Sequence, residues 1–383
     1  MKITGAEVYG PDRLFSKRDI YVKDGIIGDA SDDGVVIDAS GCIAIPGFVD
    51  IHFHGAMGCD VCDGNSKAFE VIGKYELQNG VTAMCPATLT LPVEELCNVL
   101  RLGAEYAENV PEDGADLVGF NMEGPFISRE KKGAQNEAYI MECNADVVDK
   151  FVEASKGLVK IIGLAPEVNP KFKEYIAAVK DKVKVSLAHT GTDYETAAAA
   201  IEAGASHVVH LYNAMTGLNH RAPGVVGAAS DYENVTCEMI LDGVHIHPAA
   251  ARAAYKLMGR ERIILISDSA QGTGMADGDY TLGGLPVVKE GKYCRLKSDG
   301  TIAGSVSNLY DVFRTAALEM KIPLEDVIDS CTINPARCIG VDDRYGSIEN
   351  GKIADILLIE KQSLKLFKII KNGREISQTH LAY

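Results

Sequence analysis

The sequence predicts an α/β protein, a (β/α)8 TIM barrel joined to a small β-sandwich domain made from both chain ends. Short apolar strand candidates alternate with Ala-, Glu- and Lys-rich helical stretches in the middle of the chain, whereas both ends are rich in turns. The strands follow one another at roughly 23 to 45 residues, the scale of βα units. The alternative is an open, doubly wound sheet, which is disfavoured because no Gly-x-Gly-x-x-Gly follows a strand.

The two ends of the chain have the sequence pattern of a β domain. Residues 1–45 carry short apolar runs broken by Gly-containing turns such as Asp24-Gly25, and the chain after Gly346 repeats this pattern up to Asn372-Gly373, a hairpin signal. We therefore predict a split β-sandwich domain of residues 1–47 and 339–383. The catalytic barrel of residues 48–338 would be inserted between its two parts.

Eight apolar stretches are the predicted barrel strands: 49–54, 82–87, 117–122, 161–165, 184–189, 208–212, 235–241 and 263–267. Two long loops, 124–144 and 272–305, follow the third and eighth strands, where barrel enzymes build their substrate pockets. Helices are expected over 309–320 and 323–334, where apolar residues recur at helical spacing.

Composition narrows the class of protein. The chain has 383 residues and a net charge of −16, which argues against nucleic acid as the main partner. It lacks a transmembrane run of apolar residues and an apolar signal-peptide core near Met1, so we expect a cytoplasmic protein with reduced thiols. Cys59 and Cys62 form a Cys-x-x-Cys pair, but a structural zinc site would need a second pair of like spacing.

His52 and His54 end the first predicted barrel strand. Successive side chains of a strand point to opposite faces, so these two imidazoles share one face and can bind one metal ion together. A single His-x-His is weak evidence. The pair becomes strong evidence for a metal site only if further ligands stand at the ends of other strands.

Such residues do stand at or just after the C-terminal ends of other strands: Glu123 at the third, His189 and His210 at the fifth and sixth, Asp242 and His245 at the seventh, and Asp268 at the eighth. Each alone could be a structural residue or a helix cap. In a barrel they converge on one mouth, so together they predict a metal centre. Imidazole and carboxylate ligands suit zinc, iron or manganese. We expect no metal role for His207, which would face away from His210, nor for His220 and His380.

Several motifs carry a resemblance to a known family. They are Pro46-Gly-Phe-Val-Asp before the histidine pair, Asn121-Met-Glu-Gly-Pro-Phe, His210-Leu-Tyr-Asn-Ala-Met, Arg221-Ala-Pro-Gly, Leu241-Asp-Gly-Val-His, Ser267-Asp, Ile302-Ala-Gly-Ser and the Gly346 segment. Over nearly its whole length the chain resembles the amidohydrolase superfamily and, more narrowly, its N-acetylglucosamine-6-phosphate deacetylases.

The resemblance implies a role for each matching residue. Glu123, His189 and His210 would hold the main ion, and His52 and His54, with Glu123 bridging, a second one. Asp268 would be the general base and acid. The substrate contacts would be Asn213, Ala214, Arg221, His245, Ala134, Gln135 and Ile302. The resemblance also implies a homodimer in which the Arg221 loop reaches the partner's site, and one or two ions per chain, zinc or iron first and manganese or cobalt as alternatives.

Two positions depart from the family pattern. Gln135 stands where some members have a histidine, so it can donate a hydrogen bond but cannot titrate. Around His189 the family often shows Gly-His-Ser, where this chain has Ala188 and Thr190 as neighbours. The second departure leaves the ligand intact, whereas the first affects how the substrate is held.

The expected function is removal of the acetyl group from N-acetyl-D-glucosamine 6-phosphate, giving D-glucosamine 6-phosphate and acetate. A deacetylase for the galactosamine epimer is an open alternative. Another amidohydrolase such as a dihydroorotase is disfavoured, because its bridging ligand is a carboxylated lysine and this chain has Glu123 there. A non-catalytic barrel that only binds a ligand is the remaining alternative, although it would be expected to lose ligands.

Overall fold

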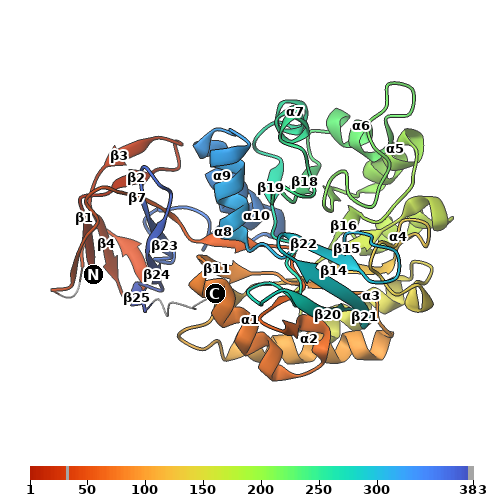
Figure 1. The fold of residues 1–383 in the computed structure, drawn as a ribbon, viewed down its shortest axis with the longest axis horizontal. Coiled ribbons are helices and arrows are strands. Elements are labelled where there is room, and N and C mark those ends of the chain that lie inside the picture. Colours follow the sequence, from red (N-terminus) through yellow and green to blue (C-terminus); the bar gives the residue numbers. More distant parts are fainter. Residues whose placement is uncertain (32–33, 378–383) are drawn as a thin grey trace.

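The computed structural model describes residues 1–31 and 34–377. Strands from the two chain ends lie side by side at one end of the molecule, and a larger body of strands and helices forms the other end (Figure 1). The predicted fold class is therefore confirmed. Among the described residues, no helix combines the length and the apolar character that crossing a bilayer requires.

Two mixed sheets form the small domain. The four-stranded sheet runs in the order β5 (Ile26–Gly28), β4 (Ile20–Lys23), β1 (Lys2–Thr4), β6 (Val36–Asp38). The six-stranded sheet runs β25 (Arg374–Ile376), β24 (Leu366–Lys371), β23 (Ile356–Glu360), β7 (Cys42–Pro46), β2 (Glu7–Tyr9), β3 (Phe15–Lys17). The C-terminal strand β23 pairs with the N-terminal strand β7, so the two chain ends share one sheet.

Apolar side chains of both sheets, among them Ile3, Val8, Ile20, Ile37 and Ile356, form one buried cluster. In the six-stranded sheet, alternate residues of β7 and β23 face this cluster and the main hydrophobic core, so both strands are buried on both faces. The boundaries drawn at residues 47 and 339 stay a prediction, and residues 378–383 of the second segment lie outside the described residues.

The barrel is built from parallel strands in two continuous parts. A three-stranded sheet has the order β13 (Asp116–Leu117), β11 (Val81–Met84), β8 (Phe48–Asp50). A seven-stranded sheet follows as β12 (Ala87–Thr88), β14 (Phe120–Phe126), β15 (Val159–Leu164), β16 (Lys184–Leu187), β17 (His207–Val208), β18 (Thr236–Met239), β19 (Ile263–Leu265). The chain of β11 continues into β12, and that of β13 continues into β14, so each of these pairs fills one strand position. The strands of the two sheets therefore occupy the eight predicted positions.

The chain after β19 meets the chain after β8. The backbone N–H of Ser267 donates to Asp50 at 3.3 Å, and that of Asp268 donates to the carbonyl oxygen of His52 at 2.9 Å. Val49 and Ile264 lie within one buried cluster inside the barrel. The eighth strand position therefore adjoins the first, which places the residues that follow both strands next to each other.

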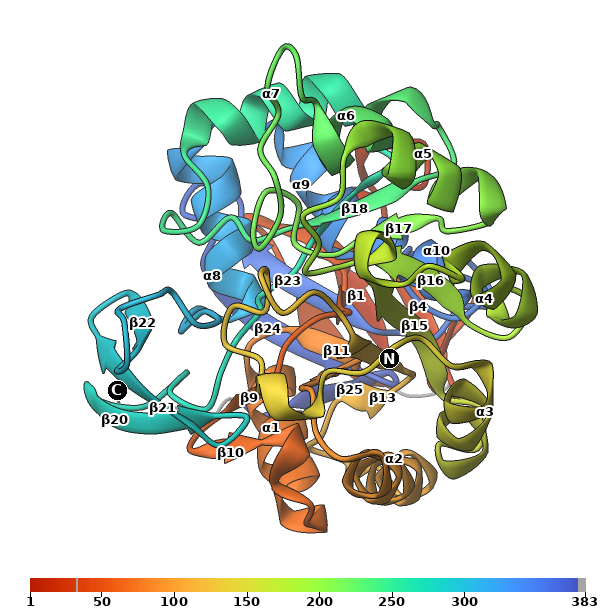
Figure 2. The same cartoon turned by 90° about the vertical axis from the view of Figure 1, so that its right-hand side faces the viewer.

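Helices surround the strands (Figure 2). They are α1 (Ser66–Gln78), α2 (Val93–Glu108), α3 (Ala145–Ala154), α4 (Phe172–Val179), α5 (Tyr194–Ala203), α6 (Gly224–Asp231), α7 (Pro248–Met258), α8 (Leu309–Arg314), α9 (Leu324–Cys331) and α10 (Ile333–Ile339). Short polar residues begin several of them. Asn65, for example, accepts a hydrogen bond from Ala68 N, and Asp193 accepts one from Thr196 N.

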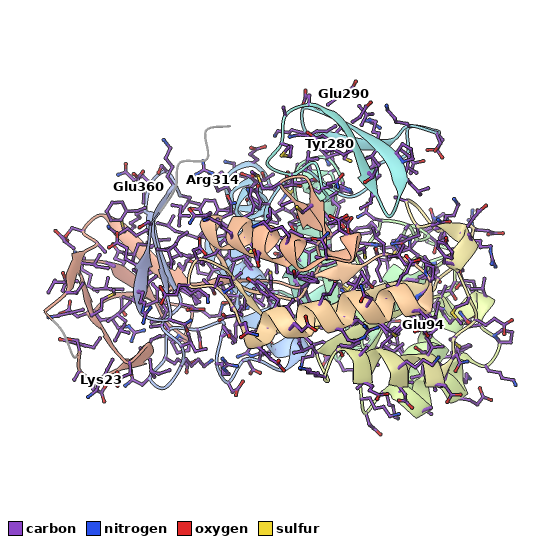
Figure 3. The ribbon with its side chains drawn as sticks, turned by 90° about the horizontal axis from the view of Figure 1, so that it is seen from below. Lys23, Glu94, Tyr280, Glu290, Arg314 and Glu360 are labelled. Atoms are coloured by element: carbon purple, nitrogen blue, oxygen red, sulfur yellow. The ribbon has the colours of Figure 1, made fainter. Side chains whose placement is uncertain are left out.

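The segment 272–305 was expected to be a loop, and that expectation is wrong. It contains an antiparallel sheet of β20 (Gly278–Leu282), β21 (Leu285–Glu290) and β22 (Tyr293–Leu296), which stands out from the barrel with Glu290 toward its outer edge (Figure 3). Gly283 and Gly284 both have positive φ and form the two-residue turn that joins β20 to β21. The glycines that indicated a loop are thus hairpin turns.

Both helices predicted after this sheet are present, but neither is one regular α-helix over the predicted range. The expected helix over 309–320 is α8 followed by a wider π-helical turn at Thr315–Glu319, and the expected helix over 323–334 ends with α9 at Cys331. Further short elements are the strands Gly55–Ala56 and Cys59–Asp60 and the 3-10 turns Val61–Asp63, Glu137–Tyr139 and Pro166–Val168.

Candidate metal centre

Three of the candidate site residues have left-handed backbone immediately beyond a strand. His189 follows β16 with φ +44°, His210 follows β17 with φ +30°, and Asp268 follows β19 with φ +48°. L-residues rarely adopt this region, and such strain persists only where the surroundings hold it. It also explains why β17 ends at Val208, well short of the predicted 208–212.

His52 and His54 do not lie on a strand, because β8 ends at Asp50. Their segment is held by other bonds. The backbone N–H of His52 donates to Asp50 Oδ1 at 3.2 Å, and that of His54 donates to the carbonyl oxygen of Ser269 at 2.7 Å. The two rings still lie together, with centroids 5.4 Å apart. The alternation of side-chain directions, which predicted that both rings lie on one face, therefore continues beyond Asp50, the last paired residue of β8.

Glu123, His189 and His210 form one buried group whose ligand atoms lie within 4.8 Å of one another. Glu123 Oε1 is 2.9 Å from His189 Nε2 and 3.0 Å from His210 Nε2. Glu123 belongs to β14, where Gly163 of the neighbouring strand β15 comes so close that a Cβ there would meet the Glu123 carbonyl oxygen at 2.6 Å. A glycine at residue 163 thus permits the backbone approach at Glu123.

His52, His54 and Asp268 form a second buried group. His54 Nε2 lies 3.3 Å from Asp268 Oδ1, and His52 Nε2 lies 3.7 Å from the same oxygen. Both nitrogens also lie 3.4 Å from an oxygen of Glu123. Glu123 therefore stands between the two groups, with an oxygen available to each.

The four rings all turn Nε2 inward and Nδ1 outward. The outward partners are Glu238 for His52 at 2.8 Å, the Ala87 carbonyl for His54 at 3.1 Å, the Lys131 carbonyl for His189 at 2.7 Å and the Asn213 carbonyl for His210 at 3.1 Å. Every one of these partners only accepts hydrogen bonds, so each Nδ1 carries the proton. In the neutral rings each Nε2 then presents a lone pair to the centre, as metal ligands do.

The atoms facing the centre fit a cation. His189 Nε2 and His210 Nε2 lie 3.1 Å apart, and two lone pairs at that separation repel each other unless a positive charge lies between them. His52 Nε2 and Asp268 Oδ1 are buried without a hydrogen-bond partner in the described part of the chain. The donors are nitrogen and oxygen without thiolate, which suits zinc, iron or manganese.

The carboxylates of the centre are ionised. Burial raises the pKa of Glu123, but its interactions with His189, His210 and His52 outweigh burial and hold that pKa well below its usual range. Burial likewise raises the pKa of Asp268, and His54 and His52 outweigh it and lower the pKa. Both side chains thus bring negative charge to a place where the histidines bring donor atoms.

A cavity of about 890 Å³ opens over the centre. Its lining includes His54, Glu123, His189, His210 and Asp268, together with the predicted substrate contacts Ala134, Gln135, Asn213, Ala214, His245 and Ile302. His52 lies beneath the lining and has no exposed surface. The structure therefore brings to one cavity the candidate residues that stand at or beyond the ends of six barrel strands.

Arg221 is the exception. It is exposed, on the loop between β17 and α6, and it is not among the residues that line the cavity. Asn219 and Ala222 pair their backbones and so close a tight turn that contains Arg221. The arginine thus lies outside the cavity of its own chain.

Gln135 is held by two bonds instead of standing free in the cavity. Its side-chain oxygen accepts from the backbone N–H of Thr90 at 2.7 Å, and its amide nitrogen donates to Glu123 Oε2. The first bond orients the amide so that its donor faces the centre. Gln135 thus directs its amide donor to the bridging carboxylate of Glu123.

The remaining expectations concern residues outside the two ligand groups. Cys59 and Cys62 are free thiols, and neither belongs to a metal-capable group of the described residues. His207 is buried and bonds to Glu238, and His220 is exposed. His380 lies outside the described residues.

Glu238 is the residue that sequence reasoning missed. It is fully buried in β18 and touches His52. A signal was present in the sequence, because Glu238 is the single charged residue of the apolar stretch 235–241. A buried carboxylate is rare unless it is paired, so a charge inside a predicted barrel strand indicates a buried partner.

Known proteins match both the sequence and the structure. The amidohydrolase family matches residues 43–381. The N-acetylglucosamine-6-phosphate deacetylase of Bacillus subtilis (strain 168) is 35% identical over 334 residues, 86% of this chain and 84% of the relative. The N-acetylgalactosamine-6-phosphate deacetylase of Escherichia coli O157:H7 is 32% identical over 342 residues, 89% of this chain and 90% of the relative.

A solved structure shares the fold over nearly the whole chain. It is a mutant N-acetyl-D-glucosamine-6-phosphate deacetylase from Mycobacterium smegmatis in complex with N-acetyl-D-glucosamine-6-phosphate, with a TM-score of 0.89, 26% identity and 98% coverage of both chains. Fold, sequence and the paired ligand groups agree on one conclusion. The chain belongs to the amidohydrolase family.

Proposed function

We propose that this protein hydrolyses the acetamide bond of N-acetyl-D-glucosamine 6-phosphate to D-glucosamine 6-phosphate and acetate, a step of amino-sugar catabolism. The observation that carries the proposal is the pair of buried ligand groups joined by Glu123, with Asp268 facing the same cavity. The relatives described above support the choice of an acetylated amino-sugar phosphate as substrate.

The two ligand groups would hold one or two divalent ions, zinc or iron first and manganese or cobalt as alternatives. Glu123, His189 and His210 would hold one ion, and His52 and His54 with Glu123 the other. Such ions supply Lewis acidity toward the amide carbonyl and toward the attacking water. An amide needs both, because its carbonyl is a poor electrophile and neutral water a poor nucleophile.

Asp268 is the proposed general base and acid. Its Oδ1 faces the centre with no hydrogen-bond partner among the described residues, so it is free to accept the proton of the attacking water. It then hands this proton to the nitrogen of the breaking C–N bond, because an amine leaves readily only once it is protonated. The acetyl carbon receives the oxygen of the water, and the sugar keeps the amine.

The sugar phosphate would lie against the other residues of the cavity. Asn213, Ala214, Ala134, Gln135 and Ile302 would contact the sugar and the acetyl group. His245 would face the phosphate. Its Nδ1 bonds to Asp242 Oδ2 at 2.8 Å, which turns the other ring nitrogen away from Asp242. Burial lowers the pKa of His245, but Asp242 outweighs burial and raises it, which favours a charged donor for an anion.

Arg221 supports a homodimer. It is exposed and lies off the cavity of its own chain, so as a phosphate ligand it would have to act in the site of a partner subunit. A planar guanidinium suits a phosphate, to which it can donate two hydrogen bonds at once. The homodimer and the cytoplasmic location stay predictions.

A deacetylase for N-acetylgalactosamine 6-phosphate is the second candidate. A relative with that activity matches the chain over 342 residues at 32% identity, close to the values of the glucosamine enzymes. The two sugars differ only in the orientation of one hydroxyl group. Hydrogen-bond geometry in the cavity would therefore decide between them.

A comparison of four substrates tests the proposal. We expect acetate release to be fastest from N-acetylglucosamine 6-phosphate, slower from its galactosamine epimer, and about 100-fold or more lower in kcat/KM from the two sugars without phosphate. Losing two charge-assisted hydrogen bonds of about 1.5–3 kcal/mol each accounts for this drop. Equal rates with and without phosphate would exclude a phosphosugar enzyme. Release from the galactosamine epimer alone would establish the second candidate, and no release from any sugar would favour a binding protein.

A further inference from the structure

A carboxylate outside both ligand groups lies directly behind the metal centre. Glu238 of β18 has no exposed surface, and its Oε2 is 2.8 Å from His52 Nδ1. It does not line the cavity, so it cannot touch a substrate. Its effect on the site must pass through the residues to which it bonds.

Four donors converge on this carboxylate. Oε2 accepts from His52 Nδ1 and from the backbone N–H of His210 at 3.2 Å, and Oε1 accepts from His207 Nε2 at 2.9 Å and from Asn121 Nδ2 at 3.2 Å. Each of its oxygens therefore has two donors. An amide at this position would turn its NH2 group toward two of them, so the surroundings fit a carboxylate and not its neutral isostere.

His207 compensates the buried charge. Its Nε2 faces the carboxylate and its Nδ1 lies 2.7 Å from Thr236 Oγ1, whose hydroxyl donates to the carbonyl oxygen of Ser206. Burial lowers the pKa of His207, but Cys338 and Glu238 outweigh burial and raise it to about 9, which favours the imidazolium form with a donor at each ring nitrogen. A buried carboxylate persists when such a partner and further hydrogen bonds satisfy it. One Glu238 oxygen thus accepts the hydrogen bond of His207, and the other accepts that of His52.

His52 differs in this respect from the other three histidines of the centre. Those three donate Nδ1–H to neutral backbone carbonyl oxygens, whereas His52 donates to a charged carboxylate. A carboxylate partner fixes the tautomer of a histidine ligand and makes its other nitrogen a stronger donor toward a metal ion. Glu238 thus bonds to a ligand side chain only in the second group, whereas it meets His210 of the first group through the backbone N–H.

We infer that Glu238 is a positioning residue that determines whether the second ion of the centre is bound. It holds His52 with Nδ1–H outward and directs the Nε2 lone pair to the space beside Glu123 and Asp268. This inference rests on the proposed metal centre with its two ligand groups. It assigns the carboxylate of Glu238, with His207 as its counter-charge, to the ion at His52 and His54, and not to the ion at His189 and His210.

Counting Zn²⁺ per chain tests the inference without any substrate. Wild-type protein and Glu238→Gln are equilibrated with stepped concentrations of Zn²⁺, and bound metal is measured by elemental analysis. We expect two ions on the wild type, and on the variant an unchanged first ion and a second ion bound about 10- to 100-fold more weakly. Glu76→Gln is the matched control, because Glu76 is also fully buried and its oxygens bond to no described residue.

A double variant separates positioning from a general effect on folding. His52→Ala should lose the second ion, and adding Glu238→Gln to it should change the metal content no further, because both act through one ligand. If Glu238→Gln does not fold, Glu238→Asp keeps the charge and draws it back by one methylene, and the same weakening of the second ion is expected.

Three results would overturn the inference. They are unchanged binding of both ions in the Glu238 variants, equal weakening of both ions, and a wild type that binds only one ion under full loading. The outcome does not depend on the reaction. A wild type that binds two ions but releases no acetate would refute the proposed function and leave the assignment of Glu238 in place.

Discussion

The Asp268→Asn protein is expected to release acetate about 10²- to 10⁴-fold more slowly than the wild type, the range that a positioned general acid and base contributes. Asparagine keeps the size of the side chain but can neither take the proton of the attacking water nor return it to the leaving nitrogen. Because the change removes an interaction of the transition state, kcat should fall while KM stays within a few-fold. Steady-state acetate release at full metal loading measures both constants.

A second explanation of the same loss has to be separated from it. Asp268 Oδ1 lies beside His54 and His52, so loss of an ion from that group would also slow the reaction. His54→Ala is the control, since it removes a ligand of the same group and leaves the carboxylate. If Asp268→Asn keeps its metal and is much slower than His54→Ala, the proton role stands. Near-normal turnover of Asp268→Asn would exclude it.

Replacing Arg221 with alanine is expected to raise KM for the 6-phosphate sugar about 10- to 100-fold with little change in kcat. One charge-assisted hydrogen-bond donor to an anion is worth about 1.5–3 kcal/mol. The guanidinium would contact the phosphate and not the acetamide, so the chemical step should proceed at its usual rate. For N-acetylglucosamine without phosphate, KM should not change. Equal effects on both substrates would exclude Arg221 as a phosphate ligand.

Mixed dimers test in whose site Arg221 acts. Arg221→Ala and Asp268→Asn subunits are each defective, and they are co-expressed with different affinity tags so that the hybrid can be isolated. If Arg221 serves the partner, the hybrid contains one complete site, and low-KM activity returns to about half of the wild-type level. If Arg221 serves its own chain, every site in the hybrid stays defective. Arg221→Lys, which keeps the charge but not the planar fork, should restore KM only in part.

The barrel and most of the candidate centre were predictable from local patterns. Apolar strands of limited length recur between helical stretches, and a parallel barrel brings all their carboxyl ends to one mouth. His189, His210 and Asp268 could therefore be grouped from the sequence, because each stands at or just after the C-terminal end of such a strand. The sheet in 272–305 was missed because the same glycines suit loops and hairpin turns, and only the pairing of β20 with β21 distinguishes them.

The amino-acid sequence by itself determined which side chains stand at the strand ends and hence which chemistry the centre can support. Only the tertiary structure decided what lies behind and around them. Glu238 is far from His52 along the chain, and Arg221 lies near His210 in sequence but off the cavity. The reason is that strand periodicity sets the direction of a side chain relative to its own strand, whereas its hydrogen-bond partners depend on which strands become neighbours when the barrel closes. The metal ligands follow from strand periodicity, whereas the carboxylate that holds His52 follows from the pairing of strands in the closed barrel.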